Sequence, residues 1–212
     1  MNNLATKLFL PFLSGLFCVF PFDTAVGQID ITFSDGSTTG TSFNVDVGTS
    51  QTISVFASET LPGTALTTDG LLGFGFEANA SATSGTAASI NGFAPNSAFV
   101  VPSVSVTPSS VDAQAATLFG SVSGTSVFLG DLDLSVTAPG STVFTFEDRD
   151  PDPDRQDFGS STQPALDSTV FQGGRSFSFT INAVSAIPEP SGGVLIGLSM
   201  LASTMRRKRN RS

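Results

Sequence analysis

The chain has 212 residues, with 9 basic and 18 acidic side chains, and it contains no His, Trp or Tyr. Without His it has no imidazole base, no Ser-His-Asp triad and no ordinary zinc site. Its one cysteine, Cys18, lies in an apolar N-terminal run that we expect to be removed, so the exported protein has no disulfide and no cysteine nucleophile. We therefore predict no catalytic residues and no enzymatic activity.

Residues 1–27 have the three-part layout of a secretory signal peptide. A single lysine precedes an apolar run over 8–22, and the small residues Ala25 and Gly27 stand three and one positions before Gln28. Signal peptidase accepts this spacing, so we predict cleavage between Gly27 and Gln28. The alternatives are a buried helix or a membrane anchor. Two prolines interrupt the run, which is shorter than the roughly 20 residues of a spanning helix.

The body of the chain, residues 28–186, is strongly acidic. It carries 16 acidic side chains against three arginines and no lysine, a formal net charge of −13. Phosphate backbones repel such a surface, so we predict no nucleic-acid partner.

Alternation of apolar and polar residues predicts strands in the body. The alternating runs lie, in chain order, at 43–47, 72–78, 132–136, 144–146 and 177–181. Each run has one apolar face and one polar face, as a half-solvated strand requires, and Gly- or Pro-containing turns separate the runs. No window of similar length has a helical period. We predict an all-β fold, a single antiparallel β-sandwich or jelly roll of about eight or nine strands with the phenylalanines as its core.

Three fragments of the body are similar to cohesin-like sandwich modules. DVGTSQTISV (46–55) resembles their opening valine-glycine turn and strand, GFGFE (73–77) their next strand, and GDLDLSVTAPGST (130–142) a late hairpin with an alanine-proline-glycine turn. The resemblance implies a binding or scaffolding module. It does not imply dockerin recognition, because no residues identify such an interface.

Residues 147–157 (EDRDPDPDRQD) are the candidate metal-binding segment. The carboxylates at near-alternate positions are Asp148, Asp150, Asp152, Asp154 and Asp157. Calcium takes about six to eight oxygen ligands, and the pattern resembles the aspartate-rich calcium loops of thrombospondin type-3 repeats. Proline occupies two spacers and no glycine supplies the sharp turn, which favours an extended backbone with its carboxylates apart. Two interpretations stand: a site for calcium, the one cofactor indicated, or an exposed acidic loop, which we favour.

The C-terminus, residues 187–212, has a second three-part layout. The motif Pro188-Glu189-Pro190 precedes an apolar stretch of 14 residues over 192–205. The basic cluster that follows consists of Arg206, Arg207, Lys208, Arg209 and Arg211. Such a cluster stays on the cytoplasmic side while the apolar stretch enters the inner membrane as a short transmembrane helix. The stretch is short for a permanent span, which favours a temporary hold during export.

These three parts, in this order and behind an export signal, closely resemble the PEP-CTERM sorting signal of Gram-negative bacteria. The resemblance implies processing near Pro188-Glu189-Pro190 by an exosortase, a membrane-embedded thiol transpeptidase-like enzyme. It also implies an inner-membrane intermediate followed by transfer to the cell surface or extracellular matrix. The alternative is an unprocessed tail that remains as an anchor.

The sequence therefore predicts an exported, non-enzymatic protein with a structural or adhesive role linked to exopolysaccharide. The alternative is a calcium-dependent carbohydrate- or protein-binding module. A third class, a secreted glycoside hydrolase with paired carboxylates, is disfavoured because the chain has no Trp or Tyr to stack on sugar rings. The sequence predicts neither the ligand of the sandwich nor its oligomeric state.

Overall fold

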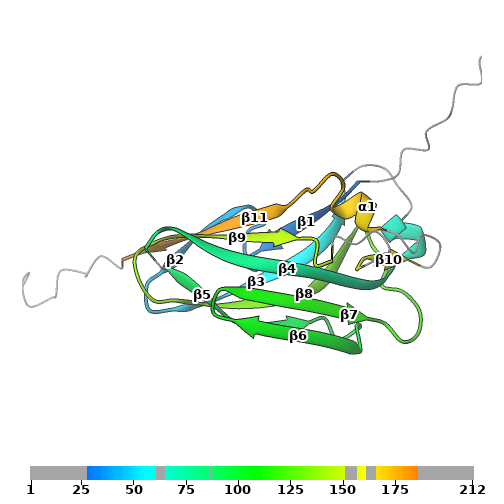
Figure 1. Cartoon of the computed structure of the whole chain (residues 1–212), viewed down its shortest axis with the longest axis horizontal. Coiled ribbons are helices and arrows are strands. Elements are labelled where there is room, and N and C mark those ends of the chain that lie inside the picture. The colour runs from blue at the N-terminus through cyan, green and yellow to red at the C-terminus, as the bar shows by residue number, and fades with distance from the viewer. Residues whose placement is uncertain (1–27, 61–64, 86, 151–156, 161–165, 186–212) are drawn as a thin grey trace, which may run out of the picture.

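The computed structural model describes residues 28–60, 65–85, 87–150, 157–160 and 166–185 (Figure 1). The predicted signal peptide, the predicted sorting tail and the middle of the acidic segment lie outside these ranges. Within them, no helix has both the length and the apolar character that crossing a membrane requires.

Strands make up nearly all of the regular structure in Figure 1. In chain order the elements are β1 (Ile29–Ser34), β2 (Ser42–Asp46), β3 (Ser50–Glu59), η1 (Ala65–Asp69), β4 (Leu71–Ser84), β5 (Ala88–Pro95), β6 (Val101–Thr107), β7 (Ser110–Ala116), β8 (Ser126–Val136), β9 (Gly140–Glu147), β10 (Gly159–Ser160), α1 (Asp167–Val170) and β11 (Phe177–Val184). The element η1 is one π-helical turn and α1 is one α-helical turn.

The strands form two sheets that pack face to face as a β-sandwich. Sheet A has the order β1-β3-β8-β5, and sheet B has the order β2-β11-β9-β4-β7-β6 with the short β10 beside β4. Neighbouring strands are antiparallel, except that β2 and β11 pair in parallel. The predicted all-β sandwich is therefore confirmed. The described residues contain eleven strands instead of eight or nine, and one pairing departs from the predicted antiparallel arrangement.

The predicted runs of alternation lie in strands β2, β4, β8, β9 and β11, except that Val47 follows the end of β2. Burial alternates with them: Phe144 and Phe146 are buried on β9, and Phe179 and Ile181 are buried on the neighbouring β11. The period of two in the sequence therefore becomes one core-facing stripe per strand.

Phenylalanine rings fill the space between the two sheets. Phe33 of sheet A lies 4.8 Å from Phe179 and 4.9 Å from Phe146 of sheet B, centroid to centroid, and all three rings are buried. Contacts between tilted rings at such distances add to the stabilisation from apolar burial. The predicted phenylalanine core is confirmed for most of the described rings. Phe119 is the clear exception, with 95% of its surface exposed.

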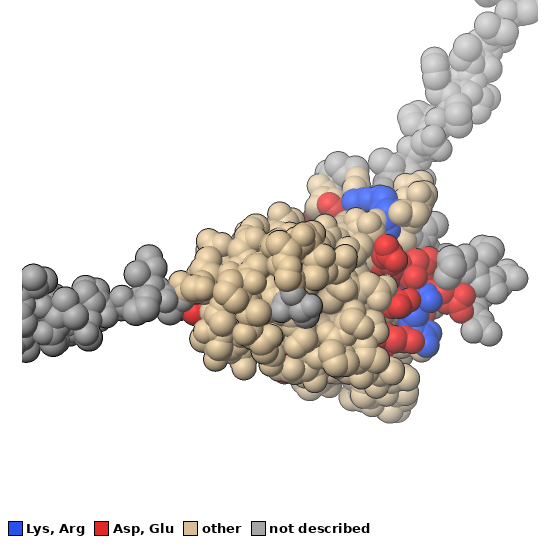
Figure 2. Space-filling view, turned by 60° about the vertical axis from the view of Figure 1, so that its left-hand side comes forward, with Lys and Arg blue, Asp and Glu red and all other residues tan. Residues whose placement is uncertain are grey.

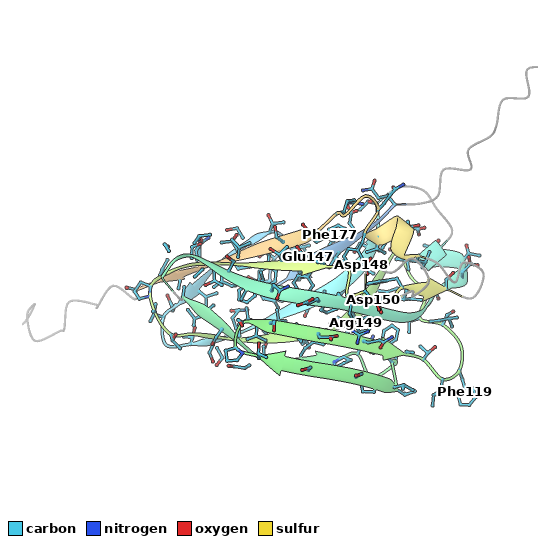
Figure 3. The ribbon with its side chains drawn as sticks, viewed as in Figure 1. Phe119, Glu147, Asp148, Arg149, Asp150 and Phe177 are labelled. Atoms are coloured by element: carbon cyan, nitrogen blue, oxygen red, sulfur yellow. The ribbon has the colours of Figure 1, made fainter. Side chains whose placement is uncertain are left out.

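Charged side chains gather at one end of the sandwich. Figure 2 shows acidic residues interleaved with arginine at the end where β10 and α1 lie, while most of the remaining visible surface is uncharged. Asp148, Arg149 and Asp150, which follow β9, lie at this end (Figure 3).

Candidate functional site

The acidic segment leaves sheet B at the end of β9 and returns to it at β10. On β4, Glu77 pairs with Glu147 of β9, and Gly73 pairs with Gly159 of β10. The other side of β4 at Gly73 is taken by Ala116 of β7, so β9 and β10 lie along the same side of β4. Strands β9 and β10 therefore follow one another along one side of β4.

Gly75 leaves room for Asp157, which lies two residues before the start of β10. It lies between the buried Phe74 and Phe76, in the alternate position that faces away from the core. A Cβ atom built on Gly75 would lie 2.7 Å from the carboxyl Cγ of Asp157. Glycine within a strand often marks such a close approach. In the Gly-Phe-Gly-Phe sequence of β4, the rings fill the core and Gly75 leaves space for Asp157.

Arg149 ties the acidic segment to the neighbouring strand. Its Nε donates a hydrogen bond to Oδ1 of Asp112 on β7, and its Nη1 lies 3.7 Å from Oδ1 of Asp157. The hydrogen bond to Asp112 raises the pKa of the guanidinium, so Arg149 stays charged. One cation from the segment thus interacts with a carboxylate on the sheet and with the carboxylate at the segment's far end.

Asp157 is the most buried carboxylate of this end, with 4% of its side chain exposed. Burial raises its pKa, the charge of Arg149 acts in the opposite direction, and the carboxylates of Asp148 and Asp150 add to the increase. Burial also raises the pKa of Asp148. Asp157 therefore carries its charge in a place where water screens it poorly.

Three of the five predicted calcium ligands are described. Figure 3 shows Asp148 and Asp150 just beyond the end of β9, and Asp157 precedes β10. Among the described residues, no three acidic, histidine or cysteine side chains are grouped so that they could hold one metal ion. Asp152 and Asp154 lie outside the described residues, so the calcium site stays a prediction.

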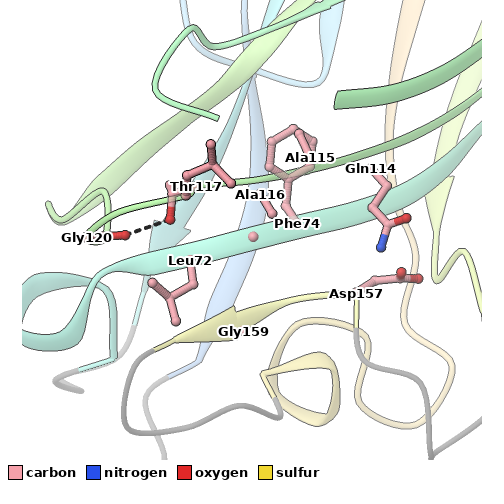
Figure 4. Close-up of a pocket in the computed structure, with 11 residues that line it drawn as sticks. Leu72, Phe74, Gln114, Ala115, Ala116, Thr117, Gly120, Asp157 and Gly159 are labelled. Atoms are coloured by element: carbon pink, nitrogen blue, oxygen red, sulfur yellow. Dashed lines mark hydrogen bonds between the residues drawn. The ribbon is translucent and has the colours of Figure 1, made fainter. Parts of the chain in front are cut away.

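A pocket of about 420 Å³ adjoins Asp157 on the solvent face of sheet B (Figure 4). Gly73, Ala116 and Gly159 line it with little or no side chain, and it lies where β4, β7 and β10 meet. Figure 4 shows Gln114 and Asp157 together on one side of the pocket. The pocket therefore combines a small, mainly apolar lining with two polar groups on one side.

Apolar side chains stand exposed beside this pocket. Leu118, which lines the pocket, is 63% exposed, and the adjacent Phe119 is almost fully exposed at the tip of the loop between β7 and β8 (Figure 3). Exposure of a large apolar side chain to water is unfavourable, and adjacent exposed apolar side chains beside a pocket are typical of interaction surfaces.

Sequence reasoning identified the acidic segment but missed both the pocket and Phe119. The glycines at 73 and 75 were part of a predicted strand, and their lack of side chains was the available signal for a second segment lying over that strand. Phe119 carried no such signal, because its neighbours Leu118 and Gly120 do not show whether the ring points inward.

The predicted processing sites are mostly outside the described ranges. This applies to Gly27, to Pro188-Glu189-Pro190 and to the basic cluster. Gln28 is the first described residue, and its carbonyl accepts a hydrogen bond from Thr60 N–H at 2.8 Å. The first strand, β1, begins at the next residue, Ile29, and both processing events stay predictions.

No family model matches the chain, and no curated protein is significantly similar to it. Among solved structures it is similar to the sixth cohesin of scaffoldin B from Acetivibrio cellulolyticus, solved in complex with a dockerin, at 12% identity and a TM-score of 0.49, covering 75% of this chain and 99% of that one. The cohesin module of a family 33 glycoside hydrolase from Clostridium perfringens gives 14% identity, a TM-score of 0.48 and coverage of 76% and 98%. A type III cohesin of Ruminococcus flavefaciens is 12% identical, with a TM-score of 0.48, and the match covers 75% of this chain and 88% of that one. These likenesses concern the sandwich fold alone.

Proposed function

We propose that the chain is the precursor of an exported, non-enzymatic protein with a structural or adhesive role at the cell surface or in an exopolysaccharide matrix. Signal peptidase would release Gln28 as the new N-terminus, and an exosortase would process the tail. The observation that carries this proposal is the order of parts in the last 26 residues: Pro188-Glu189-Pro190, an apolar stretch and a basic cluster, in a chain that begins with an export signal.

The absence of a catalytic role is supported by what the paired carboxylates of the sandwich contact. Asp131 accepts a hydrogen bond from Ser54 Oγ at 2.7 Å, and Asp133 accepts one from Thr52 Oγ1 at 2.8 Å. Both lie on the solvent face of sheet A as ordinary cross-strand partners. These carboxylates therefore have a structural explanation that requires no substrate.

The adhesive role is assigned to the solvent face of sheet B. Its pocket, with Gln114 and Asp157 on one side and the exposed Leu118 and Phe119 beside it, offers polar groups for orientation and apolar surface for contact. Phe119 is the one ring among the described residues that is almost completely exposed, so it is available to contact a sugar ring or an apolar side chain of a partner.

Intact-mass spectrometry of the protein recovered from the surface and culture fluid of producing cells tests the proposed processing. The expected mass corresponds to a chain that starts at Gln28 and ends near Pro188-Glu189-Pro190. A matched variant, Glu189→Ala, should keep the tail and remain with the inner membrane. An exported protein that ends at Ser212 would overturn the sorting proposal, because the tail would then be a lasting part of the protein.

A further inference from the structure

Within the part of the chain that the structure describes, strand β6 is an edge strand of sheet B, and only its C-terminal end is approached by another strand, where Ile90 N–H of β5 donates to Pro108 C=O at 3.0 Å. It lies at the end of the order β2-β11-β9-β4-β7-β6 and pairs only with β7. Its sequence, VPSVSVT, has no charged residue, and every residue except Val104 is classed as exposed. Natural edge strands are commonly shielded by charge, bulges or covering segments. Here Pro102 is the only such device on the strand.

The hydrogen-bonding pattern shows which groups of β6 point away from the sheet. Just before β7, the Ser109 C=O accepts a hydrogen bond from Ala80 N–H of β4, and just after β7, the Thr117 N–H donates one to Leu72 C=O of β4. The backbone N–H and C=O groups of the odd-numbered residues of β7 therefore point toward β4. The even-numbered residues of β7 therefore bond to their β6 partners at 101, 103, 105 and 107. The N–H groups of Val104 and Val106 consequently point outward. Within the described part of the chain, no hydrogen-bond acceptor contacts them.

The outward groups of β6 match a second copy of the same strand. When two antiparallel copies overlap along the whole of 101–107, Val104 stands opposite Val104 of the partner copy, and Val106 stands opposite Pro102 of the partner copy. Each Val104 N–H then meets the other Val104 C=O, and each Val106 N–H meets a Pro102 C=O. Proline lacks an N–H group, but this register places its carbonyl, which it retains, opposite a donor.

Apolar contact accompanies these hydrogen bonds. Val104 lies opposite the buried Ala113, and Val106 lies opposite the buried Val111, so both valines occupy the core-facing side of sheet B. Val106 is 37% exposed at the free edge. A second β6 would place Pro102 and Val104 of the partner copy against this apolar row and cover it.

The charge of the body does not oppose this arrangement. The nearest carboxylate on β7 is Asp112, opposite Ser105, and it already interacts with Arg149. Three strand spacings, about 14 Å, separate the two copies of β7 in the joined sheet, which exceeds the screening length of about 8 Å at physiological salt. A two-fold axis also points the two charged ends in opposite directions, because β6 begins beside the pocket at that end.

We infer that the sandwich associates with a second copy of itself through antiparallel pairing of the two β6 strands, centred on Val104. The symmetry makes the contact self-complementary, and it joins the two B sheets into one continuous sheet. The contact leaves the solvent face of sheet B, with its pocket, open in both copies. This inference does not depend on the proposed function.

Sedimentation of the protein over a range of concentrations tests the association. The wild type should sediment as a dimer at high concentration, and Val104→Pro should weaken the dimer at least about tenfold, because it removes two hydrogen bonds between the copies. The substitution leaves the β6–β7 ladder intact, since Val104 N–H does not bond to β7. Val106→Lys, which places charge at the edge, is a second variant with the same expected effect, and circular dichroism confirms folding of both. A wild type that stays monomeric at every concentration, or a dimer that withstands both variants, overturns the inference.

Disulfide cross-linking tests the register. Cys18 is the chain's only cysteine, so in a Cys18→Ser background one introduced thiol is the only thiol of the protein. Val104→Cys should form a covalent dimer under mild oxidation, because directly opposite residues lie about 5.5 Å apart between Cα atoms. Val101→Cys is the matched control: Val101 is 50% exposed, but its copies lie six residues out of register and should not cross-link. Equal cross-linking by the two variants, or self-cross-linking of Ser105→Cys in place of Val104→Cys, contradicts this pairing.

Discussion

The solvent faces of the two sheets are constructed in different ways. On sheet A, neighbouring strands satisfy one another: hydroxyls of Ser54 and Thr52 on β3 bond to Asp131 and Asp133 on β8. On sheet B, the face near the charged end depends on a segment that arrives after β9, with Asp157 placed over Gly75 and Arg149 reaching Asp112.

This difference separates a local arrangement from one that depends on a distant segment. The hydroxyl–carboxylate hydrogen bonds on sheet A depend only on strand register. If one side chain of such a pair is removed, the other can bond to water instead, at little cost in stability. The face of sheet B needs a glycine, a buried carboxylate and an arginine in the correct positions together. Substitutions on the two faces should therefore differ in effect even when the residue types are the same.

The largest expected difference is between two glycines. Gly75→Ala places a Cβ against Asp157 and should lower the free energy of unfolding by about 1–3 kcal/mol in urea titrations, as overpacking of a filled site does. Gly92→Ala on β5 of sheet A is the matched control, because its nearest neighbour, Asp133 Oδ2, lies 4.0 Å from the added carbon. It should change stability by about 0.5 kcal/mol or less. Similar losses at both glycines would show that Asp157 is not held against β4.

The next largest effect concerns the two arginines. Arg149→Met should cost about 1–2 kcal/mol, because it removes the cation that lies 3.7 Å from the buried Asp157, while solvent screens the half-exposed Asp112. Arg175→Met removes a surface pair with Asp30 at 2.7 Å and a contact with the Phe177 ring, and it should cost less than about 1 kcal/mol. Urea unfolding measures both variants. The reverse order would contradict the role given to Arg149.

A smaller effect depends on pH and has a defined sign. The pKa of Asp157 is raised by burial above its ordinary value of 3.8, so its contribution to stability is present below that value and is lost as the pH rises through the raised pKa. The neutral side chain of Asp157→Asn does not ionise, so its stability does not fall in this pH range. The variant should therefore melt at a higher temperature than the wild type at pH 7, and this difference in melting temperature should shrink toward pH 4. A constant difference at all pH values would contradict the burial of the charge.

Asp35 provides the control of opposite sign. The backbone N–H groups of Thr38 and Ser37 lower the pKa of this exposed carboxyl. Its contribution is therefore present above 3.8 and is lost as the pH falls through the lowered pKa. Asp35→Asn should melt at a lower temperature than the wild type at pH 7, and the difference should vanish in strong acid.

The smallest expected effect is that of calcium. Arg149 already supplies positive charge between Asp112 and Asp157, so millimolar Ca²⁺ should leave the melting temperature unchanged, with no binding heat in calorimetry. Magnesium serves as the control for general ionic effects. A rise in melting temperature with calcium alone would establish the calcium-dependent alternative, with Asp148 and Asp150 as the first ligands to substitute.

The sequence predicted those parts of the fold that depend on period and burial. Alternation of large apolar residues, as at Phe144 and Phe146 or at Phe179 and Ile181, identified strands correctly because each of these strands has one face buried in the core. Strands β1, β5, β6, β7 and β10 were not among the predicted runs. Of these, β6 has almost no buried face, and β10 has only two residues and so shows no period. The turns η1 and α1 are likewise too short to show a helical period.

The site was less predictable than the fold for a related reason. The acidic segment was visible because its charge is concentrated in the chain, whereas the pocket forms only when β10 returns beside Gly73 and β7 lies on the other side. The parallel pairing of β2 with β11 similarly joins residues far apart in the sequence, and neither strand specifies its partner. Contacts of this kind depend on topology, which a single strand's pattern does not encode.

We propose that the solvent face of sheet B, beside the pocket, is the adhesive surface. Co-sedimentation of the protein with exopolysaccharide from the cells that produce it tests this proposal. We predict that Leu118→Ser with Phe119→Ser reduces the bound fraction at least about fivefold, the scale expected from losing one exposed aromatic contact. The matched control, Val184→Ser, changes a 44% exposed apolar residue at the end of β11 and should bind as the wild type does. Equal binding by all three proteins would contradict the claim.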